Sequence, residues 1–213
     1  MDFVFDPSLV LYLPLWKLDG ASIMSQDAYG HTCTVTGALW RPNGTYFDGS
    51  DDNIATSAVG LPTGAGDRTL EVWFKGPSLA GITNDTIIGW GSSVAQQAST
   101  LSIGTVGDSK PMFWGYNSDL TFGTALTDDT WYHLVATVAG GTAVIGYNNG
   151  NTDGSSTITA LNTPASTTFY VADFTGATFG NCTCTIGEVR IYSRALTPQE
   201  IQHNYLATKW RYR

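Results

Sequence analysis

The sequence predicts an all-β protein in which two antiparallel sheets pack face to face, with one short helix near the C-terminus. The 213 residues include 24 Gly, which favours tight turns, whereas Glu, a strong helix former, occurs only at Glu71, Glu188 and Glu200. Hydrophobic residues make up 42% of the chain, which is enough for a real core. The segments that alternate between apolar and polar residues are too many for one open sheet, so we expect two.

Short alternating segments bounded by Gly, Pro, Asn and Asp predict the strands in order. The expected strands cover residues 8–15, 31–36, 46–49, 53–57, 69–75, 86–90, 100–104, 111–116, 120–122, 131–139, 142–147, 156–160, 168–171 and 186–193. Residues 37–44, with Trp40 and Pro42, read as irregular. No linker and no internal repeat interrupts the chain, so we expect one domain over residues 1–213.

Residues 186–201 combine a strand with the start of a helix. Glu188, Arg190 and Tyr192 alternate with Val189, Ile191 and Ser193, which is the period-2 pattern of a strand with two different faces. Thr197-Pro198-Gln199-Glu200 then supplies an N-cap Thr, a Pro at the first helical position and a Glu at the third. This capping box predicts that the last strand is followed by one short helix.

A second strand, residues 69–75, carries candidate binding residues. Leu70, Val72 and Phe74 fall on one face and should enter the core, which places Glu71, Trp73 and Lys75 in a row on the other, open face. Residues 111–116 likewise place Trp114 and Tyr116 on one face, and the pattern allows both to share the open face with Trp73 and His133.

This composition is typical of a carbohydrate-binding groove. Sugar rings stack on indoles through their apolar C–H faces, while acids, amides and amines bind the hydroxyl groups. The predicted ligand-binding residues are Glu71, Trp73, Lys75, Trp114, Tyr116 and His133. The alternative for each aromatic residue is packing under a loop.

Charge and hydropathy exclude two classes of partner. The net charge is −8, with only 10 Lys and Arg spread along the chain, so no basic patch for nucleic acid is expected. The basic residues near the C-terminus suit a helix end and its dipole. No apolar run approaches the roughly 20 residues of a membrane span, and Met1-Asp2-Phe3 lacks the positive segment of a signal peptide.

The three cysteines, Cys33, Cys182 and Cys184, do not form a disulfide framework because their number is odd. Cys182 and Cys184 are two residues apart, so they share one face of a strand. We expect small buried hydrophobic residues. One bridge from Cys33 to Cys182 or Cys184 stays an alternative if the first and last strands pair.

Four sequence blocks occur in an order found in a known family. They are Asp27-Ala28-Tyr29-Gly30-His31 with residues 35–38, Tyr46-Phe47-Asp48-Gly49 with Asp52, Trp131-Tyr132-His133-Leu134-Val135-Ala136 with residues 147–150, and residues 187–201. Together they resemble the laminin-G-like branch of the concanavalin A-like lectin/glucanase superfamily, over nearly the whole chain. The resemblance implies a two-sheet antiparallel jelly roll in which Trp131 is a core tryptophan. It also implies functions such as carbohydrate binding, cell adhesion or display on virus and phage particles.

The catalytic motifs of that superfamily are missing. Its glycoside hydrolases carry E-x-D-x-x-E on one strand, where alternation places the carboxylates on one face. Here Glu71 is followed by Val72-Trp73-Phe74-Lys75, with no second acid, and Arg68-Thr69-Leu70-Glu71 is only a scrambled likeness of a lyase motif. The sequence therefore predicts a protein that is not an enzyme.

The resemblance also implies a structural calcium site, because some relatives are stabilised by calcium. The residues that could contribute are Asp27, Asp48 and Glu188, although Gly187 stands where the family pattern has Asp. Calcium needs six or more oxygen ligands, several of them from carboxylates. The alternative is that Asp27 and Asp48 hold turns through hydrogen bonds to the backbone.

The leading hypothesis is a non-catalytic recognition module that binds carbohydrate or a glycoconjugate, outside the cell or on a particle surface, as the resemblance implies. One alternative is a structural or assembly domain of a phage, virus or surface protein, as an oligomer or within a larger parent protein. The other is a polysaccharide-active hydrolase or lyase without the usual motif.

Overall fold

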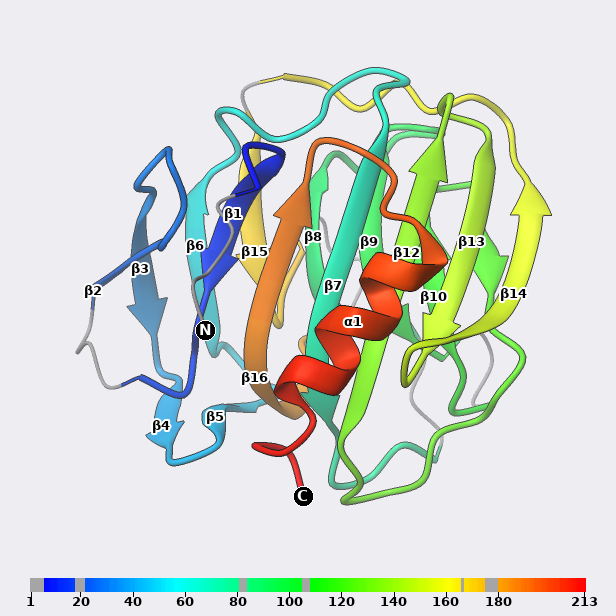
Figure 1. Cartoon of the computed structure of the whole chain (residues 1–213). Helices are drawn as coiled ribbons and strands as arrows, with labels where there is room; N and C mark the ends of the chain where they lie inside the picture. Colours follow the sequence, from blue (N-terminus) through cyan, green and yellow to red (C-terminus); the bar gives the residue numbers. More distant parts are fainter. Residues whose placement is uncertain (1–5, 18–21, 81–83, 105–107, 166, 175–179) are drawn as a thin grey trace.

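Two eight-stranded antiparallel sheets pack face to face in the computed structural model, and one helix crosses the outer face of one of them (Figure 1). The structure describes residues 6–17, 22–80, 84–104, 108–165, 167–174 and 180–213. Within these ranges the predicted fold class is confirmed, with two sheets and one short helix near the C-terminus.

The first sheet carries the helix. Its strand order is β14-β13-β12-β7-β16-β5-β4, and β1 pairs with β16 beside this path. The bounds are β1 (Leu9–Leu13), β4 (Leu39–Arg41), β5 (Gly44–Asp48), β7 (Arg68–Lys75), β12 (Tyr132–Ala139), β13 (Ala143–Asn148), β14 (Asn151–Thr157) and β16 (Thr183–Tyr192).

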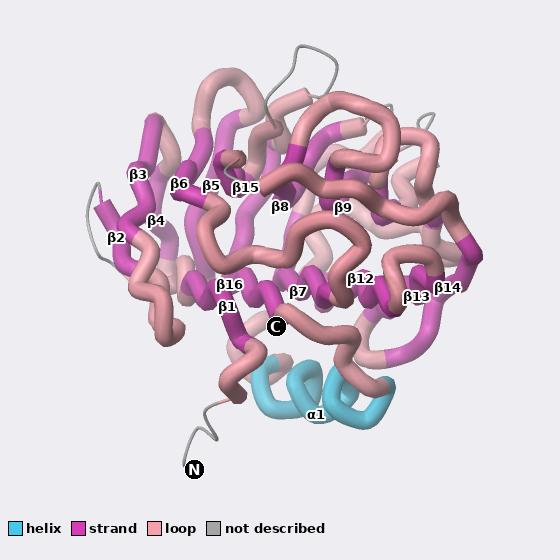
Figure 2. The backbone as a smooth tube through the Cα atoms, turned by 90° about the horizontal axis from the view of Figure 1, so that it is seen from above, coloured by secondary structure: helices cyan, strands magenta, loops and turns pink. Residues whose placement is uncertain are grey.

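The second sheet covers the other side of the core. Its strand order is β11-β10-β9-β8-β15-β6-β3-β2. The bounds are β2 (Ser22–Met24), β3 (Thr32–Thr36), β6 (Asn53–Ser57), β8 (Asp85–Gly91), β9 (Ala98–Ile103), β10 (Pro111–Trp114), β11 (Leu120–Thr121) and β15 (Thr168–Val171). Figure 2 shows the two layers from above, with the helix outside the first sheet.

The core lies between the two sheets and follows the predicted alternation. Leu70, Val72 and Phe74 of β7 point into it, as expected from the sequence. Phe113 of β10 and Phe169 of β15 meet them from the second sheet, and all of these side chains are buried. The opposite residues of β7 therefore face outward, toward the helix.

The helix α1 (Pro198–Thr208) begins with the predicted capping box. The Thr197 hydroxyl accepts a hydrogen bond from the Glu200 backbone N–H at 3.3 Å, and the Glu200 carboxylate accepts one from the Thr197 N–H at 2.8 Å. Arg194 pairs with Glu200 at 2.7 Å and with Asp6 at 2.6 Å. These contacts fix the start of α1 against β16 and the N-terminal segment. In the described ranges, α1 is not long and apolar enough to cross a membrane.

Three segments differ most from the sequence prediction. One is β2 (Ser22–Met24), which lies where no strand was expected. The strand expected at residues 156–160 begins earlier, at Asn151, because Asn149 and Gly150 adopt positive φ angles of 51° and 78° and reverse the chain at once. The segment expected to be irregular contains β4, a three-residue edge strand in which every residue is exposed. A strand exposed on both faces shows no apolar alternation, so the pattern could not reveal it.

All three cysteines are buried free thiols. Cys182 and Cys184 share one face, as predicted, and lie in the core cluster with Cys33. Cys33 belongs to β3 in the second sheet, whereas Cys184 belongs to β16 in the first. The alternative of a bridge is therefore wrong, and the expectation of small buried hydrophobic residues is confirmed.

We expect the native protein to be unreactive toward a thiol reagent at pH 8. Burial raises the pKa of Cys33 to about 11 and also raises the pKa of Cys182, so neither forms the reactive thiolate. Labelling with a chromogenic disulfide reagent should modify no cysteine in buffer and all three in guanidinium chloride. Rapid labelling of the native protein would contradict the position of these thiols in the core.

Candidate functional site

The outer face of the first sheet brings together four of the predicted binding residues. Trp73 of β7 lies opposite His133 of β12, and Glu71 and Lys75 lie on the same face of β7. However, α1 covers this face: Trp73 and Glu71 are each 2% exposed, and His133 is fully buried. The prediction of an open face is therefore wrong for these three residues. Lys75 stays half-exposed, 3.7 Å from Asp129.

Trp114 and Tyr116 lie on the other side of the molecule. They belong to β10 and the turn after it, in the second sheet, and Trp114 packs edge-on against Tyr116 and Phe174, with ring centroids 5.0 and 5.9 Å apart. The prediction that they share a face with Trp73 is wrong, because alternation assigns a face within a sheet but not the sheet. Tyr116 has a positive φ of 59°, so the alternation ends before it.

A buried polar network joins the sheet to the helix. The Glu71 carboxylate accepts hydrogen bonds from His133 Nε2 at 2.9 Å, from Arg190 at 2.8 Å and from the Asn204 side-chain amide of α1 at 2.9 Å. Arg190 also pairs with Glu188 at 3.0 Å. A buried charge is tolerated only when it is paired and hydrogen-bonded in this way.

The network keeps Glu71 ionised. Burial alone would raise its pKa, but the charge of Arg190 and the hydrogen bonds from His133 and Asn204 outweigh burial and lower the pKa of Glu71 to about 2. Two of the three glutamates of the chain, Glu71 and Glu188, are thus buried and paired with Arg190. Glu71 also joins the helix through Asn204, whereas Glu188 bonds to Tyr12 and Arg190.

Trp73 attaches the C-terminal end of α1 and the segment after it. Its indole Nε1 donates to the Thr208 hydroxyl at 2.8 Å. Its ring stacks on Tyr212 and Tyr205, with centroids 4.4 and 5.8 Å apart. The position of Tyr212 also explains Gly187: a Cβ at Gly187 would lie 2.2 Å from the Tyr212 ring. An Asp at this position, as in the pattern that the sequence resembles, would have to displace the outer end of the Tyr212 ring.

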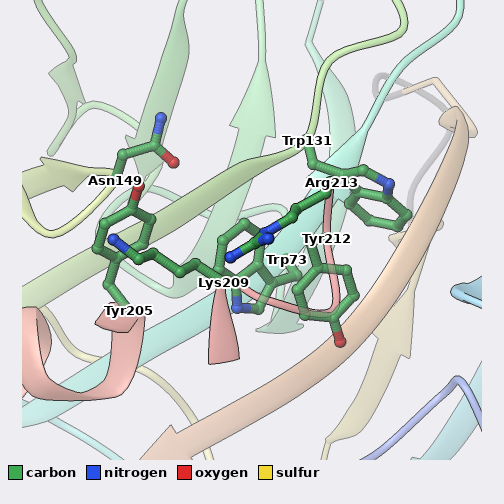
Figure 3. Close-up of a pocket in the computed structure, with 7 residues that line it drawn as sticks. All are labelled: Trp73, Trp131, Asn149, Tyr205, Lys209, Tyr212 and Arg213. Atoms are coloured by element: carbon green, nitrogen blue, oxygen red, sulfur yellow. The ribbon is translucent and has the colours of Figure 1, made fainter. Parts of the chain in front are cut away.

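A cleft opens beside this aromatic stack, at the C-terminal end of α1. Its volume is about 330 Å³, and we call it the helix-end cleft. The side chains that line it are Trp73, Trp131, Asn149, Tyr205, Lys209, Tyr212 and Arg213 (Figure 3). They come from β7, the residue before β12, the β13–β14 turn, α1 and the segment after it.

The helix-end cleft combines aromatic rings with polar groups. Trp131 is half-buried at the cleft rather than in the core, with its ring centroid 4.9 Å from that of Tyr212. Asn149 Oδ1 accepts from the His133 backbone N–H at 3.0 Å, which leaves its Nδ2 group without a protein partner in the described part of the chain. A ring face beside a free amide is the arrangement that binds a sugar ring and its hydroxyl groups.

Sequence reasoning found only Trp73 among the lining residues. It placed Trp131 in the core and treated the basic residues near the C-terminus as a solvated helix end. The spacing of Tyr205 and Lys209, four residues apart, predicts that both lie on one face of the helix. This spacing could be read from the sequence. The sequence did not show which strands and turns lie opposite these two side chains.

The three predicted metal ligands do not come together. Asp27 accepts hydrogen bonds from the backbone N–H groups of Tyr12, Tyr29 and Gly30 at 3.0, 2.8 and 3.2 Å, as the turn-holding alternative expected. The Glu188 carboxylate pairs with Arg190 and accepts from a tyrosine hydroxyl. The predicted ligand set is therefore wrong for Asp27 and Glu188, because protein donors occupy both carboxylates.

Asp48 has different acidic neighbours. Among the described residues, the one acidic group with ligand atoms within 4.8 Å of one another is Asp48, Asp51 and Asp52. Asp48 accepts from the Ser50 N–H and Asp52 accepts from the Asp48 N–H, so part of the oxygen set is already used. Three carboxylates in these roles fall short of the coordination that calcium prefers. Calcium binding stays a prediction from the family.

Comparison with known families agrees with the fold. The sequence model described as the concanavalin A-like lectin/glucanases superfamily, of the laminin G type, matches residues 48–202. The chain belongs to this superfamily. The resemblance predicted from the four sequence blocks is thus confirmed, including the jelly roll. A search of curated proteins finds no match.

Solved structures share the fold at low identity. The botulinum neurotoxin serotype G binding domain matches with a TM-score of 0.72 and 16% identity, over 94% of this chain and 51% of that chain. The binding domain of Paraclostridial Mosquitocidal Protein 1 matches with a TM-score of 0.72 and 17% identity, over 94% and 52%. A Trypanosoma rangeli sialidase, solved with 2,3-difluorosialic acid as a covalent intermediate, matches with a TM-score of 0.71 and 17% identity, over 97% and 34%.

This chain thus spans about half the length of the two binding domains and a third of the sialidase. Both binding proteins and an enzyme contain the fold, so the fold alone does not decide between these functions. The single domain over residues 1–213 stays a prediction.

We expect Trp73→Ala to destabilise the protein by about 3–5 kcal/mol, because it removes a buried indole, its hydrogen bond to Thr208 and two ring contacts. Urea unfolding followed by circular dichroism measures the loss. Trp210→Ala is the matched control, since Trp210 is 60% exposed, and it should change stability by less than about 0.5 kcal/mol. Equal effects of the two substitutions would contradict the docking of α1 on Trp73.

We also expect acid to weaken the protein through Glu71. Its pKa falls from the usual 4.5 in the unfolded chain to about 2 in the fold, so its stabilising contribution is complete above pH 4.5 and is lost as the pH falls toward 2. Glu71→Gln should lower stability at pH 7 and flatten the dependence between pH 4.5 and 2. Asp51→Asn, which alters an exposed carboxylate, is the control. An unchanged pH profile in Glu71→Gln would count against the network.

Proposed function

We propose that this chain is a non-catalytic recognition module that binds carbohydrate at the helix-end cleft, outside the cell or on a particle surface. The observation that carries the proposal is the lining of the cleft, which combines the rings of Trp131 and Tyr205 with the Asn149 amide. Apolar ring faces with a few polar groups are what a sugar site needs. The superfamily and the binding domains that share the fold support a binding role.

The positions of the acids support a non-catalytic role. No carboxylate side chain is among the residues that line the helix-end cleft. Retaining glycosidases need two carboxyl groups about 5–5.5 Å apart at the bond that breaks. Glu71 and Glu188 are buried and paired with Arg190, so neither can supply that pair. If the protein were an enzyme of this type, its catalytic carboxylates would have to lie outside the helix-end cleft.

A glycan and polysaccharide panel tests the proposal, run with calcium and with chelator. We expect binding that Trp131→Ala weakens by about fivefold, since one ring contact is worth about 1 kcal/mol. Trp210→Ala, which removes an exposed indole outside the cleft, should leave the affinity unchanged. Binding that is insensitive to Trp131→Ala would exclude the cleft as the site, and product release from the panel would exclude the non-catalytic role.

An assembly role is the second candidate function, and one surface favours it. Met24, Leu39 and Trp40 are 55%, 61% and 43% exposed, and they lie on or beside the edge strands β2 and β4. Exposed apolar side chains that gather at sheet edges are typical of contact surfaces between proteins.

Light scattering separates the two candidates. A stable trimer or larger assembly with no binding to any glycan would favour the assembly role. A monomer that binds glycans would exclude it. Replacement of Trp40 by Ser should shift any oligomer toward the monomer if this edge forms the contact.

A further inference from the structure

The helix-end cleft is positively charged in an acidic protein. The chain carries a net charge of −8, yet the charged side chains that line the cleft are Lys209 and Arg213, with no acid among them. Both cations lie at the cleft in Figure 3. We therefore ask what holds two positive side chains at this cleft when the chain as a whole is acidic.

The other cations of the same region have partners inside the protein. Arg190 and Arg194 form ion pairs with glutamates, and the Arg211 guanidinium lies 3.6 Å from the centre of the Trp16 ring. Neither Lys209 nor Arg213 forms an ion pair within the described ranges. No acidic side chain of the described residues therefore neutralises either charge.

The helix dipole explains only one of the two charges. Lys209 is the C-cap residue of α1, where a cation interacts favourably with the helix end. Arg213 lies four residues beyond this position and is outside the last turn, within which the dipole acts. Lys209 also stands over the Tyr205 ring, with Nζ 5.3 Å from the ring centre. The Lys209 ammonium thus lies at the aromatic wall of the cleft.

The size of the cleft limits the ligand. Its volume of about 330 Å³ is at the lower end of the range for small-molecule sites, about 300–1,000 Å³. A single terminal sugar residue fits that volume better than the middle of a long chain. A guanidinium binds the two oxygens of a carboxylate or sulfate side by side, and an ammonium adds a second charge.

Resting on the proposed function, we propose that the helix-end cleft binds the acidic terminal residue of a glycan, whose carboxylate or sulfate pairs with Lys209 and Arg213. The sugar ring stacks on Trp131, and the Asn149 amide donates to a hydroxyl group of the glycan. The shared chemistry is a sugar anion, and a uronic acid or a sulfated hexose would supply it.

Titration calorimetry with matched glycosides tests this inference. The probes are methyl glucuronoside against methyl glucoside, and methyl galactoside 6-sulfate against methyl galactoside. We expect at least one acidic member to bind about tenfold or more tightly than its neutral partner, which is the gain from one charge-assisted pair. The preference should shrink as salt rises from 0.05 to 0.5 M, because the cations are partly exposed (about 10 Å screening length at 0.1 M).

Charge removal locates the site. The double variant Lys209→Gln, Arg213→Gln should abolish the preference, because it lowers the affinity for the acidic glycoside at least tenfold more than the affinity for its neutral partner. Lys17→Gln, Arg41→Gln removes the same two charges away from the helix-end cleft and should keep the preference. The single variant Arg213→Gln, an exposed position, provides a second test if the double variant unfolds.

The outcomes separate the inference from the proposed function. Equal binding of acidic and neutral partners overturns the inference and leaves carbohydrate recognition intact. No binding of any glycoside or panel member overturns the proposed function itself. An acidic preference that survives Lys209→Gln, Arg213→Gln, or that falls equally in Lys17→Gln, Arg41→Gln, places the anion elsewhere and overturns the inference.

Discussion

The contact between the buried Glu71 carboxylate and the Asn204 amide decides how the rest of this face is built. Glu71 and Asn204 are 133 residues apart in sequence, and their hydrogen bond joins a central strand of the first sheet to the only helix of the described chain. A helix of 11 residues is marginal in water when it stands alone. Its stability therefore comes from docking, and the ionised Glu71, held by Arg190 and His133, supplies the polar half of the docking surface.

Trp73 supplies the apolar half and, through it, shapes the cleft. Its ring supports Tyr205 and Tyr212, which come from α1 and the segment after it. The cleft forms between these rings and the side chain of Trp131. A residue predicted to touch a ligand thus acts mainly as the floor that positions other residues. The proposed binding surface therefore lies at the end of the helix rather than in the middle of the sheet.

Local sequence patterns predicted what depends on neighbours in the chain. The alternation of Leu70, Val72 and Phe74 identified the core face of β7, and Thr197 with Glu200 identified the helix start, since both signals act within a few residues. The same patterns did not reveal what covers Trp73 or in which sheet Trp114 lies. Both depend on pairing between distant segments, for which the sequence carries no short-range signal. The helix-end cleft is assembled from four such segments, so its residues could be found only in the fold.

Gly187 has a wider consequence. Its missing side chain makes room for the Tyr212 ring, where the pattern that the sequence resembles has Asp. A side chain at this position would have to displace the outer end of the Tyr212 ring, which is one wall of the cleft. A position on a buried strand, far in sequence from most of the lining residues, thus sets the shape of an opening at the surface.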